Sequence, residues 1–579
     1  MSPVVRIVRR PLLVSPDGLP AALHPVLRRV YAARSVGTGD ELDHALARLP
    51  PPGGLRGAAE AAERLARALA GDEHILIVGD FDADGATSSA VAVGALRAMG
   101  GRRVGFLVPD RFRYGYGLTP EIVEVALARR PDLIVTVDNG VASVAGVAAA
   151  NAAGVDVIVT DHHLPGHELP AAAAIVDPSL PGCAFSGHAL AGVGVIFYVL
   201  LALRAHLRDA GWFERRGVPE PRLADFLDLV ALGTVADVVP LGRVNRILVA
   251  QGLERIRAGR ACPGVAALLE VAGRDPRRAT AADLGYFVAP RLNAAGRLED
   301  MTVGIDCLLA PRLDEARVLA ARLDGFNRER RRIEEGMQEQ ARALVERLQL
   351  GGEGELPVGL CLFDAGWHQG VVGLLASRLK ERLHRPVVAL ALADGGWARG
   401  SGRSVPGVHL RDVLEAVATA NPGLIERFGG HAMAAGLTLR AADVPAFAAA
   451  FDTEVRRWLA PEEIAGVVHS DGEIAREDLR RELAEAVRQG GPWGQAFPEP
   501  AFDGRFDVLS TRVVGDRHLR LLLRPAGGEP AVEAIAFNKA GEAADGLPAR
   551  LRFAYHLDLD DYRGGTDLQL RVAHWEATG

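Results

Sequence analysis

Residues 75–85 read ILIVGDFDADG, so an uninterrupted apolar run ends directly in three closely spaced aspartates, Asp80, Asp82 and Asp84. A short apolar run that glycine and polar residues terminate is typical of a strand buried on both faces of a parallel sheet. In open α/β sheets, ligands bind beyond the carboxyl ends of such strands. Because neighbouring carboxylates repel one another unless cations neutralise them, this stretch predicts a metal site at a strand end.

Three further apolar runs end in acidic or histidine motifs. The motifs are Asp138-Asn139-Gly140, Asp161-His162-His163 and Asp237, which follow the runs at residues 133–137, 157–160 and 229–236. We interpret every one of these runs as a strand, so that all the motifs face one crevice. Carboxylates mixed with imidazole suit a divalent cation of the manganese or magnesium type. The ligands are numerous enough for two ions, and two ions about 3.5–4 Å apart form a clamp for displacement at phosphorus.

Each motif alone has an ordinary structural explanation. An Asp-x-Asp pair after a strand is often only a loop or a helix cap, and an Asp-Asn-Gly sequence is a common turn. A histidine pair is more often a surface or structural feature. The occurrence of all the motifs at successive predicted strand ends favours the metal site instead. We expect Asp161 to orient a neighbouring imidazole from outside the metal site.

Length and composition limit the class of protein. The 579 residues exceed what one core accommodates, which predicts three or four domains. A formal net charge of -7 argues against a polycation that coats duplex DNA, although a local basic groove remains compatible with it. The four cysteines lie far apart with no CxxC pair, which predicts a reducing, cytoplasmic environment without zinc. The longest uncharged apolar stretch, residues 190–203, is shorter than a membrane span.

The pattern of elements predicts an α/β protein with two lobes and a barrel. Strands alternate with Ala-rich helical stretches from about residue 71, which favours a doubly wound parallel sheet. Residues 327–348 predict a long charged helix, and short alternating runs after about residue 465 predict an OB-like β-barrel. The expected divisions are a helical N-terminal lead-in at 1–70, a catalytic domain at 71–250, a helical connector at 251–350, a second, smaller α/β lobe at 351–460 and the barrel at 461–579.

The motifs together resemble those of the DHH phosphoesterase superfamily. Longer strings resemble the RecJ family of single-strand-specific 5′→3′ DNA exonucleases, namely residues 79–85, PRLNAAGRL at 290–298 and GSGRS at 400–404. The string GGHAMAAG at 429–436 resembles the glycine-rich motif of the DHH-associated C-terminal subdomain. The resemblance extends from about residue 20 to the end of the chain. It departs from the family at Asp177-Pro178, where Asn-Pro is frequent, so we leave Asp177 outside the metal site.

The resemblance implies a role for each matching residue of the carboxylate motifs. Two manganese or magnesium ions would be held by Asp80, Asp82, Asp84, Asp138, His162 and Asp237. Asp138 would bridge the ions, His163 would contact the scissile phosphate, and Asp161 would complete the catalytic group. The implied reaction is hydrolysis of single-stranded DNA from its 5′ end by a hydroxide that the two metals activate. The implied setting is DNA repair and recombination, with a helicase and a single-strand-binding protein as candidate partners and no membrane.

Cationic and polar residues within the family strings are the candidates for binding the nucleic acid. They are Arg111, Arg291, Asn293, Arg297, Ser401, Arg403 and His431. A guanidinium binds two phosphate oxygens at once, and residues 401–404 are suited to an anion nest. The resemblance implies that this nest and Arg111 capture the 5′ end. Any single arginine, taken alone, is more often part of a solvated salt bridge.

Several alternatives remain open at this stage. A short-oligonucleotide or cyclic-dinucleotide phosphodiesterase and a pyrophosphatase share the superfamily motifs, but they lack the extra barrel. A replication scaffold with the same fold has broken metal motifs, whereas every ligand position is intact here. The motifs do not distinguish RNA from DNA. Trp367 either stacks on a base or packs under the second lobe, and the barrel tyrosines Tyr555 and Tyr562 are either stacking platforms or core residues.

Overall fold

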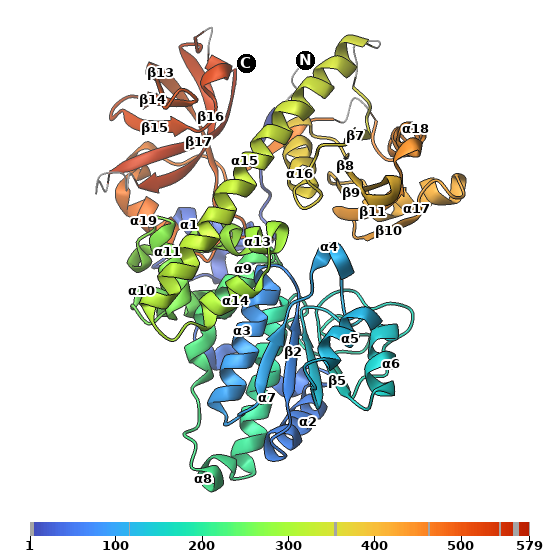
Figure 1. The fold of residues 1–579 in the computed structure, drawn as a ribbon. Helices are drawn as coiled ribbons and strands as arrows, with labels where there is room; N and C mark the ends of the chain where they lie inside the picture. Colours follow the sequence, from blue (N-terminus) through green and yellow to red (C-terminus); the bar gives the residue numbers. More distant parts are fainter. Residues whose placement is uncertain are drawn as a thin grey trace.

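The computed structural model describes residues 5–114, 116–351, 356–460, 464–543, 546–559 and 567–577. A five-stranded parallel sheet in the order β3-β2-β4-β5-β6 forms the first lobe, which lies lowest in Figure 1. Its strands are β2 (Ile75–Gly79), β3 (Val104–Leu107), β4 (Leu133–Val137), β5 (Asp156–Thr160) and β6 (Ala174–Val176). Three of the four apolar runs of the sequence are therefore strands, as predicted.

Helices cover both faces of this sheet, because successive side chains of each strand point to opposite faces. On one face, Ile75 and Ile77 pack with α2 (Ala58–Ala70), α3 (Ala83–Ala98) and α7 (Gly192–Asp209). On the other face, Leu76 and Val78 pack with α5 (Pro120–Leu127) and α6 (Val144–Ala152). The doubly wound arrangement predicted for this lobe is confirmed.

The fourth apolar run corrects the sequence analysis, because residues 229–236 form part of a helix and not a strand. Helix α9 (Leu227–Ala236) packs against α3, α7 and α10 (Arg243–Arg257), and most of its residues are buried. A helix that is enclosed on all sides loses the apolar periodicity that distinguishes it from a strand. Asp237 nevertheless reaches the strand ends, since it follows the C-terminus of α9 directly.

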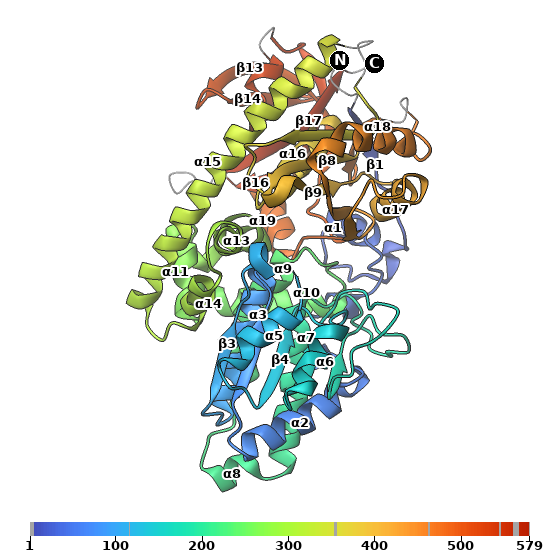
Figure 2. The same ribbon diagram turned by 45° about the vertical axis from the view of Figure 1, so that its right-hand side comes forward.

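A helical region connects the first lobe to the rest of the molecule. It comprises α10, α11 (Pro263–Val271), α13 (Ala289–Leu298), α14 (Thr302–Leu309) and α15 (Leu313–Gly351). The long predicted helix begins at Leu313, earlier than the expected Asn327. In both views α15 runs along the molecule, and in Figure 1 it lies between the barrel and the second lobe (Figures 1 and 2). Among the residues that the structure describes, no helix has the length and apolar character needed to cross a bilayer.

The second lobe contains a mixed sheet in the order β10-β11-β9-β8-β7. Its strands are β7 (Leu360–Asp364), β8 (Val387–Ala393), β9 (Trp397–Arg403), β10 (Arg427–Gly430) and β11 (Ala434–Arg440). One face packs against α15 and α16 (Val372–Leu383), and the other against α17 (Leu410–Ala420) and α18 (Val444–Val455). Trp367 is buried and its indole N–H donates to Gln340 Oε1 at 2.9 Å, so it packs under the lobe.

The C-terminal strands close into a barrel in the order β13-β14-β15-β17-β16. They are β13 (Phe502–Val514), β14 (His518–Pro525), β15 (Val532–Ala536), β16 (Arg550–Leu559) and β17 (Leu568–Ala577). Tyr555 is buried and its ring packs edge-on against Phe506 at 5.5 Å between centroids, so it is a core residue. Tyr562 lies outside the described residues. The predicted barrel is confirmed.

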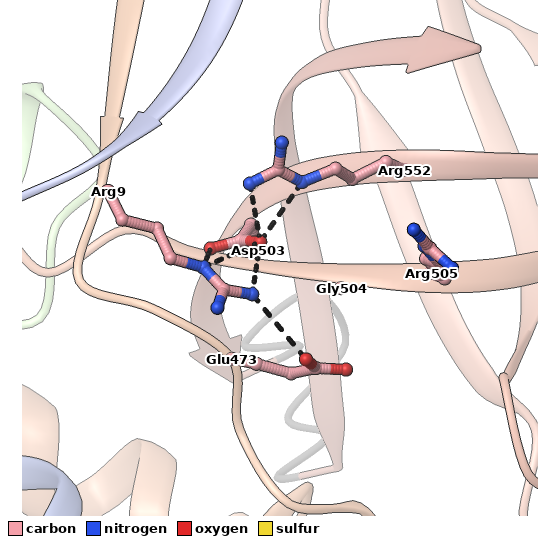
Figure 3. Close-up of a pocket in the computed structure, with 6 residues that line it drawn as sticks. All are labelled: Arg9, Glu473, Asp503, Gly504, Arg505 and Arg552. Carbon is pink, nitrogen blue, oxygen red and sulfur yellow. Dashed lines mark hydrogen bonds and ion pairs between the residues drawn. The ribbon is translucent and has the colours of Figure 1, made fainter. Parts of the chain in front are cut away.

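The N-terminal segment ties the barrel to the rest of the chain. Strand β1 (Val5–Arg9) pairs in parallel with β12 (Gly466–Ser470), so the predicted helical lead-in also contains a strand, besides α1 (Pro25–Ala32) and α2. Figure 3 shows Arg9 and Arg552 reaching the buried Asp503, each 2.8–2.9 Å from its carboxylate oxygens at the nearest approach. Glu473 and Arg505 line the same cavity of about 300 Å³.

Candidate metal centre and nucleic-acid interface

The turn after β2 places the first aspartates at the N-terminus of α3. Asp82 caps this helix, because its Oδ1 accepts from the backbone N–H groups of Asp84 and Gly85 at 2.9 and 3.0 Å. Gly85 is required here, since a Cβ at this position would lie 2.5 Å from the carbonyl oxygen of Asp80. The tight turn therefore collects Asp80, Asp82 and Asp84 at one end of the sheet.

Asp84 is enclosed by protein and held by a second helix. Its carboxylate accepts from the backbone N–H groups of Gly192 and Val193 at 2.6 and 2.9 Å, in the first turn of α7. A helix N-terminus favours a negative charge, which offsets part of the desolvation of Asp84. A Cβ on Gly192 would lie 2.6 Å from Cβ of Asp138, so this glycine lets α7 approach the site.

Asp138 follows β4 with a backbone φ of 62°, a left-handed conformation that is uncommon for a residue with a side chain. Its Oδ1 lies 3.0 Å from His162 Nε2, which is in turn 3.6 Å from Asp237 Oδ2 and 4.0 Å from Asp84 Oδ2. Strained backbone of this kind concentrates at functional sites, where the surrounding structure holds it in place.

The donor atoms fit a divalent cation. Three groups of side chains each have one ligand atom per residue, all within 4.8 Å of one another: Asp80, Asp82 and Asp138; Asp84, His162 and Asp237; and Asp138, His162 and His163. All six predicted metal ligands occur in these groups, and Asp138 belongs to two of them. The shared Asp138 is compatible with its predicted bridging role, which stays a prediction. Carboxylate oxygens and imidazole nitrogen form the donor set that manganese and magnesium sites use.

The ionisation of these groups reflects their burial beside one another. Burial and the charge of Asp82 raise the pKa of Asp84 to about 7, and burial with the charge of Asp84 raises the pKa of Asp237 to about 9. The pKa of Asp138 is raised for the same reasons. Burial, followed by the charge of His163, lowers the pKa of His162 to about 4, so its imidazole is neutral and can donate a lone pair. A bound cation favours the charged carboxylates instead.

His163 is held in a different state from His162. Its Nδ1 lies 2.7 Å from Asp161 Oδ1, and the other oxygen of Asp161 accepts from the backbone N–H of Val141 at 2.9 Å. Burial alone lowers the pKa of His163, but the hydrogen bond and the charge of Asp161 raise it to about 9. A cationic imidazolium suits a phosphate group, and the contact with Asp161 is compatible with its predicted orienting role, which stays a prediction.

Comparisons with known proteins show the family to which this chain belongs. Family models match the DHH family N-terminal domain at residues 74–234, the DHHA1 domain at 355–457 and the RecJ OB domain at 470–574. The single-stranded-DNA-specific exonuclease RecJ of Dickeya dadantii is 53% identical over 577 residues, which cover 99% of each chain. This chain belongs to the RecJ family.

Two solved RecJ structures share the complete fold. Crystal structures of RecJ from Thermus thermophilus in complex with Mn²⁺ and with Mg²⁺ match with TM-scores of 0.81 and 0.75, at 30% and 29% sequence identity. Each match covers 100% of this chain and 80% or 79% of the solved chain. The resemblance inferred from the motifs is therefore confirmed for the family and for the fold.

Three of the predicted substrate-binding residues in this RecJ-family chain make contacts within the protein. Asn293 Oδ1 accepts from Ala83 N at 2.8 Å and so supports the N-terminus of α3. Arg291 is buried and its Nε donates to Asp324 Oδ1 at 3.0 Å, while Arg297 Nη1 donates to the carbonyl of Gly370 at 3.0 Å, between the helical region and the second lobe. These contacts give all three residues structural roles, and their contact with DNA stays a prediction.

Ser401 and Arg403 form a polar corner on β9 of the second lobe. Arg403 Nη1 donates to Ser401 Oγ at 2.6 Å and to the Gly402 carbonyl at 2.8 Å. A Cβ on Gly373 would lie 3.0 Å from Arg403 Nη2 and 3.2 Å from Ser401 Oγ, so the N-terminus of α16 lies against this corner. A guanidinium, a hydroxyl and a helix N-terminus together favour an anion. Burial lowers the pKa of Arg403, which still remains charged.

The last two predicted substrate-binding residues are His431, in a loop, and Arg111, in a short helix. His431 follows β10, and burial, followed by the charge of His163, lowers its pKa. Arg111 begins the short helix α4 (Arg111–Tyr114), but its side chain lies outside the described residues.

Tyr116 is a residue of the site that the sequence analysis did not select. Its hydroxyl donates to the Asp138 carbonyl at 3.2 Å, and its oxygen lies 3.0 Å from His163 Nδ1. Its position between Gly115 and Gly117, soon after the arginines of α4, is the signal that could have identified it. No periodicity in this loop predicts which side chain reaches His163.

Proposed function

We propose that this chain is a single-stranded-DNA-specific exonuclease that hydrolyses its substrate from the 5′ end with two manganese or magnesium ions. The observation that carries the proposal is the convergence of six oxygen and nitrogen ligands from β2, β4, β5, α3 and α9 on one buried centre. Identity of 53% over nearly the full length with a RecJ exonuclease, and fold similarity to metal-bound RecJ structures, support it further.

The residues of the chain would divide the work of hydrolysis between them. Asp80, Asp82, Asp84, Asp138, His162 and Asp237 would hold the two ions, with Asp138 between them. Two such metal ions lower the pKa of a bound water and stabilise charge on the attacking and leaving oxygens of an in-line displacement. His163, oriented by Asp161, would donate to a non-bridging oxygen of the scissile phosphate and stabilise the charge that develops there.

The polar corner of the second lobe supports capture of the 5′ end. Ser401, Arg403 and the N-terminus of α16 would bind the terminal phosphate together with Arg111, and this contact would place the first phosphodiester at the ions. His431 of the glycine-rich loop would add a contact to the same substrate. Arg297 of the helical region donates to the Gly370 carbonyl of the second lobe, a contact that supports a path from this corner to the metal centre.

The remaining parts of the proposal concern organisation and setting. We propose that residues 71–250 and 351–460 form the DHH and DHH-associated units, and that 461–579 form the barrel, which contacts single-stranded DNA or a partner protein. The boundary proposed at residue 250 falls within α10. Repair and recombination in the cytoplasm, with a helicase and a single-strand-binding protein, belong to the same proposal.

Degradation of end-labelled DNA tests this function directly. Single-stranded and duplex substrates labelled at the 5′ or the 3′ end are incubated with Mn²⁺, beside the Asp138→Ala variant. We expect the 5′ label of the single strand to be released first, and we expect this release to be lost in the variant. Absence of release from every long strand would overturn the proposal and favour dinucleotide or pyrophosphate substrates.

A further inference from the structure

Tyr116 joins the two halves of the candidate active site. Its hydroxyl donates to the Asp138 carbonyl at 3.2 Å, on the metal-binding side. The same oxygen lies 3.0 Å from Nδ1 and 3.4 Å from Nε2 of His163, on the phosphate-binding side. The rings of Tyr116 and His163 also meet edge to face, with 5.5 Å between centroids and 69° between planes. One side chain therefore contacts the backbone of a metal ligand and the imidazole that would bind the phosphate.

Counting hydrogens defines what each partner does. Asp161 Oδ1 lies 2.7 Å from His163 Nδ1 and accepts its hydrogen. The phenol has a single hydrogen, which it donates to the Asp138 carbonyl. The phenol oxygen therefore presents its lone pairs to the imidazole. The single hydrogen on His163 Nδ1 is shared between Asp161 Oδ1, the nearer acceptor at 2.7 Å, and the phenol oxygen at 3.0 Å, which leaves the Nε2 hydrogen for a phosphate.

The backbone next to Tyr116 is anchored while its ring remains accessible. The N–H of Leu118 donates to Ser143 Oγ at 3.0 Å, at the start of α6. Gly117 has a φ of 81°, and a Cβ there would lie 3.0 Å from the same Ser143 Oγ. The residue Tyr116 exposes 48% of its surface even though its hydroxyl is inside the site. The side chain is thus fixed at its hydroxyl and open at its ring, where substrate would approach.

We propose that Tyr116 is a positioning residue whose hydroxyl holds the His163 imidazole ring in the orientation that the scissile phosphate requires. This inference rests on the proposed function, because it needs His163 to act on a phosphodiester. It assigns the hydroxyl, and not the ring, as the group that matters. It also assigns the effect to His163 and not to the metal ligand Asp138.

The variant Tyr116→Phe tests the hydroxyl, because it retains the ring. We expect kcat on 5′-labelled single-stranded DNA with Mn²⁺ to fall about ten-fold or more, in line with the loss of one hydrogen bond to a charged group. KM and the affinity for Mn²⁺, measured by calorimetric titration, should change less than about two-fold, since the Asp138 carboxylate remains. Tyr198→Phe is the matched control, because the buried Tyr198 hydroxyl has no hydrogen-bond partner among the described residues. This control should retain wild-type kcat.

A double-mutant cycle with His163→Ala separates the proposal from a purely structural role. If Tyr116 acts through His163, adding Tyr116→Phe to the His163→Ala variant should cause no further loss of kcat. An equal loss in both backgrounds, unchanged kcat in Tyr116→Phe, or weakened Mn²⁺ binding in Tyr116→Phe would overturn the proposal. The wild-type chain reports on the proposed function separately. If it releases the 5′ label while Tyr116→Phe is fully active, only the role of Tyr116 fails, whereas an inactive wild type overturns both.

Discussion

Two buried aspartates, Asp84 in the candidate metal centre and Asp503 beneath the barrel, are equally buried, but their pKa values are shifted in opposite directions. Each exposes about 1% of its surface. Burial alone would raise both pKa values, but hydrogen bonds from Arg9, Ser470 and Arg552 lower the pKa of Asp503 to about 2. Asp84 accepts from two backbone N–H groups and from Ser88 Oγ at 3.5 Å, and it lies beside His162 and other carboxylates. Burial and the charge of Asp82 raise its pKa to about 7. Arginines of the chain neutralise the buried Asp503, whereas Asp84 clusters with other buried carboxylates and has no arginine partner among the described residues, and such a cluster favours an external cation.

The largest effect expected from this contrast is on activity, in the variant Asp237→Asn. The substitution retains the shape of the side chain and removes its charge, so one ion loses a ligand. Since loss of a group that only supports a ligand costs roughly 10–100-fold, we expect 5′-end release from single-stranded DNA to fall at least about 100-fold. The variant should also need a higher Mn²⁺ concentration than the wild type to reach half of its maximal rate. Wild-type rates at every Mn²⁺ concentration would remove Asp237 from the metal site.

The matching change under the barrel, Asp503→Asn, should affect stability and leave the reaction intact. It removes the negative charge between Arg9 and Arg552. Because both arginines are partly exposed to water, we expect the free energy of unfolding to fall by only about 2 kcal/mol. Chemical denaturation at pH 7 measures this difference. The pKa of Asp503 is lowered on folding, so its contribution is present above about pH 4 and is lost as the pH falls through about 2. A variant with the same free energy of unfolding as the wild type at pH 7 would contradict the structural role.

Without metal, the stability of the wild-type chain should decrease as the pH becomes alkaline. The pKa values of Asp84 and Asp237 are raised on folding, to about 7 and about 9, from roughly 4 in an unfolded chain. Their favourable protonation is complete below about pH 4 and is lost as the pH rises through about 7 to 9. With EDTA we therefore expect the melting temperature to fall over this range, and excess Mn²⁺ should suppress the fall. Asp237→Asn should show a smaller decline in EDTA, and an identical decline would argue against the assignment.

The sequence predicts most of the candidate metal centre because most of its residues directly follow buried strands or helices that end at the same edge of the sheet. Asp80, Asp138 and His162 follow strands of one parallel sheet, and the carboxyl ends of such strands meet at one edge. Asp237 lies close to Asp84 and His162, although its apolar run is the enclosed helix α9 and not the predicted strand. A motif that ends a buried element can be located without knowledge of whether the element is a helix or a strand.

The contacts that depend on side-chain reach could not be predicted in this way. Tyr116 meets His163 across a loop that has no periodicity, and Arg291 is paired with Asp324 on a different helix. Sequence patterns give the type of each side chain, but the choice between a substrate contact and an internal ion pair depends on tertiary packing. The barrel tyrosine Tyr555 illustrates the same limit, because alternation predicts its strand but not that its ring fills the core.

The smallest predicted effect concerns Asp177, a third buried aspartate that has neither an arginine nor a place in the metal centre. Its Oδ1 accepts from Ser179 N at 2.7 Å, whereas its Oδ2 has no hydrogen-bond partner among the described residues. Burial raises its pKa to about 7, so folding is weakened as the pH rises from about 4 through 7. Asp177→Asn removes the ionisable proton and should stabilise the chain by about 1 kcal/mol at pH 8 and by much less at pH 5. Melting curves with Mn²⁺ at both pH values measure this difference. A variant that is less stable than the wild type at pH 8 would indicate that the Asp177 carboxylate has a cationic partner, as Asp503 has.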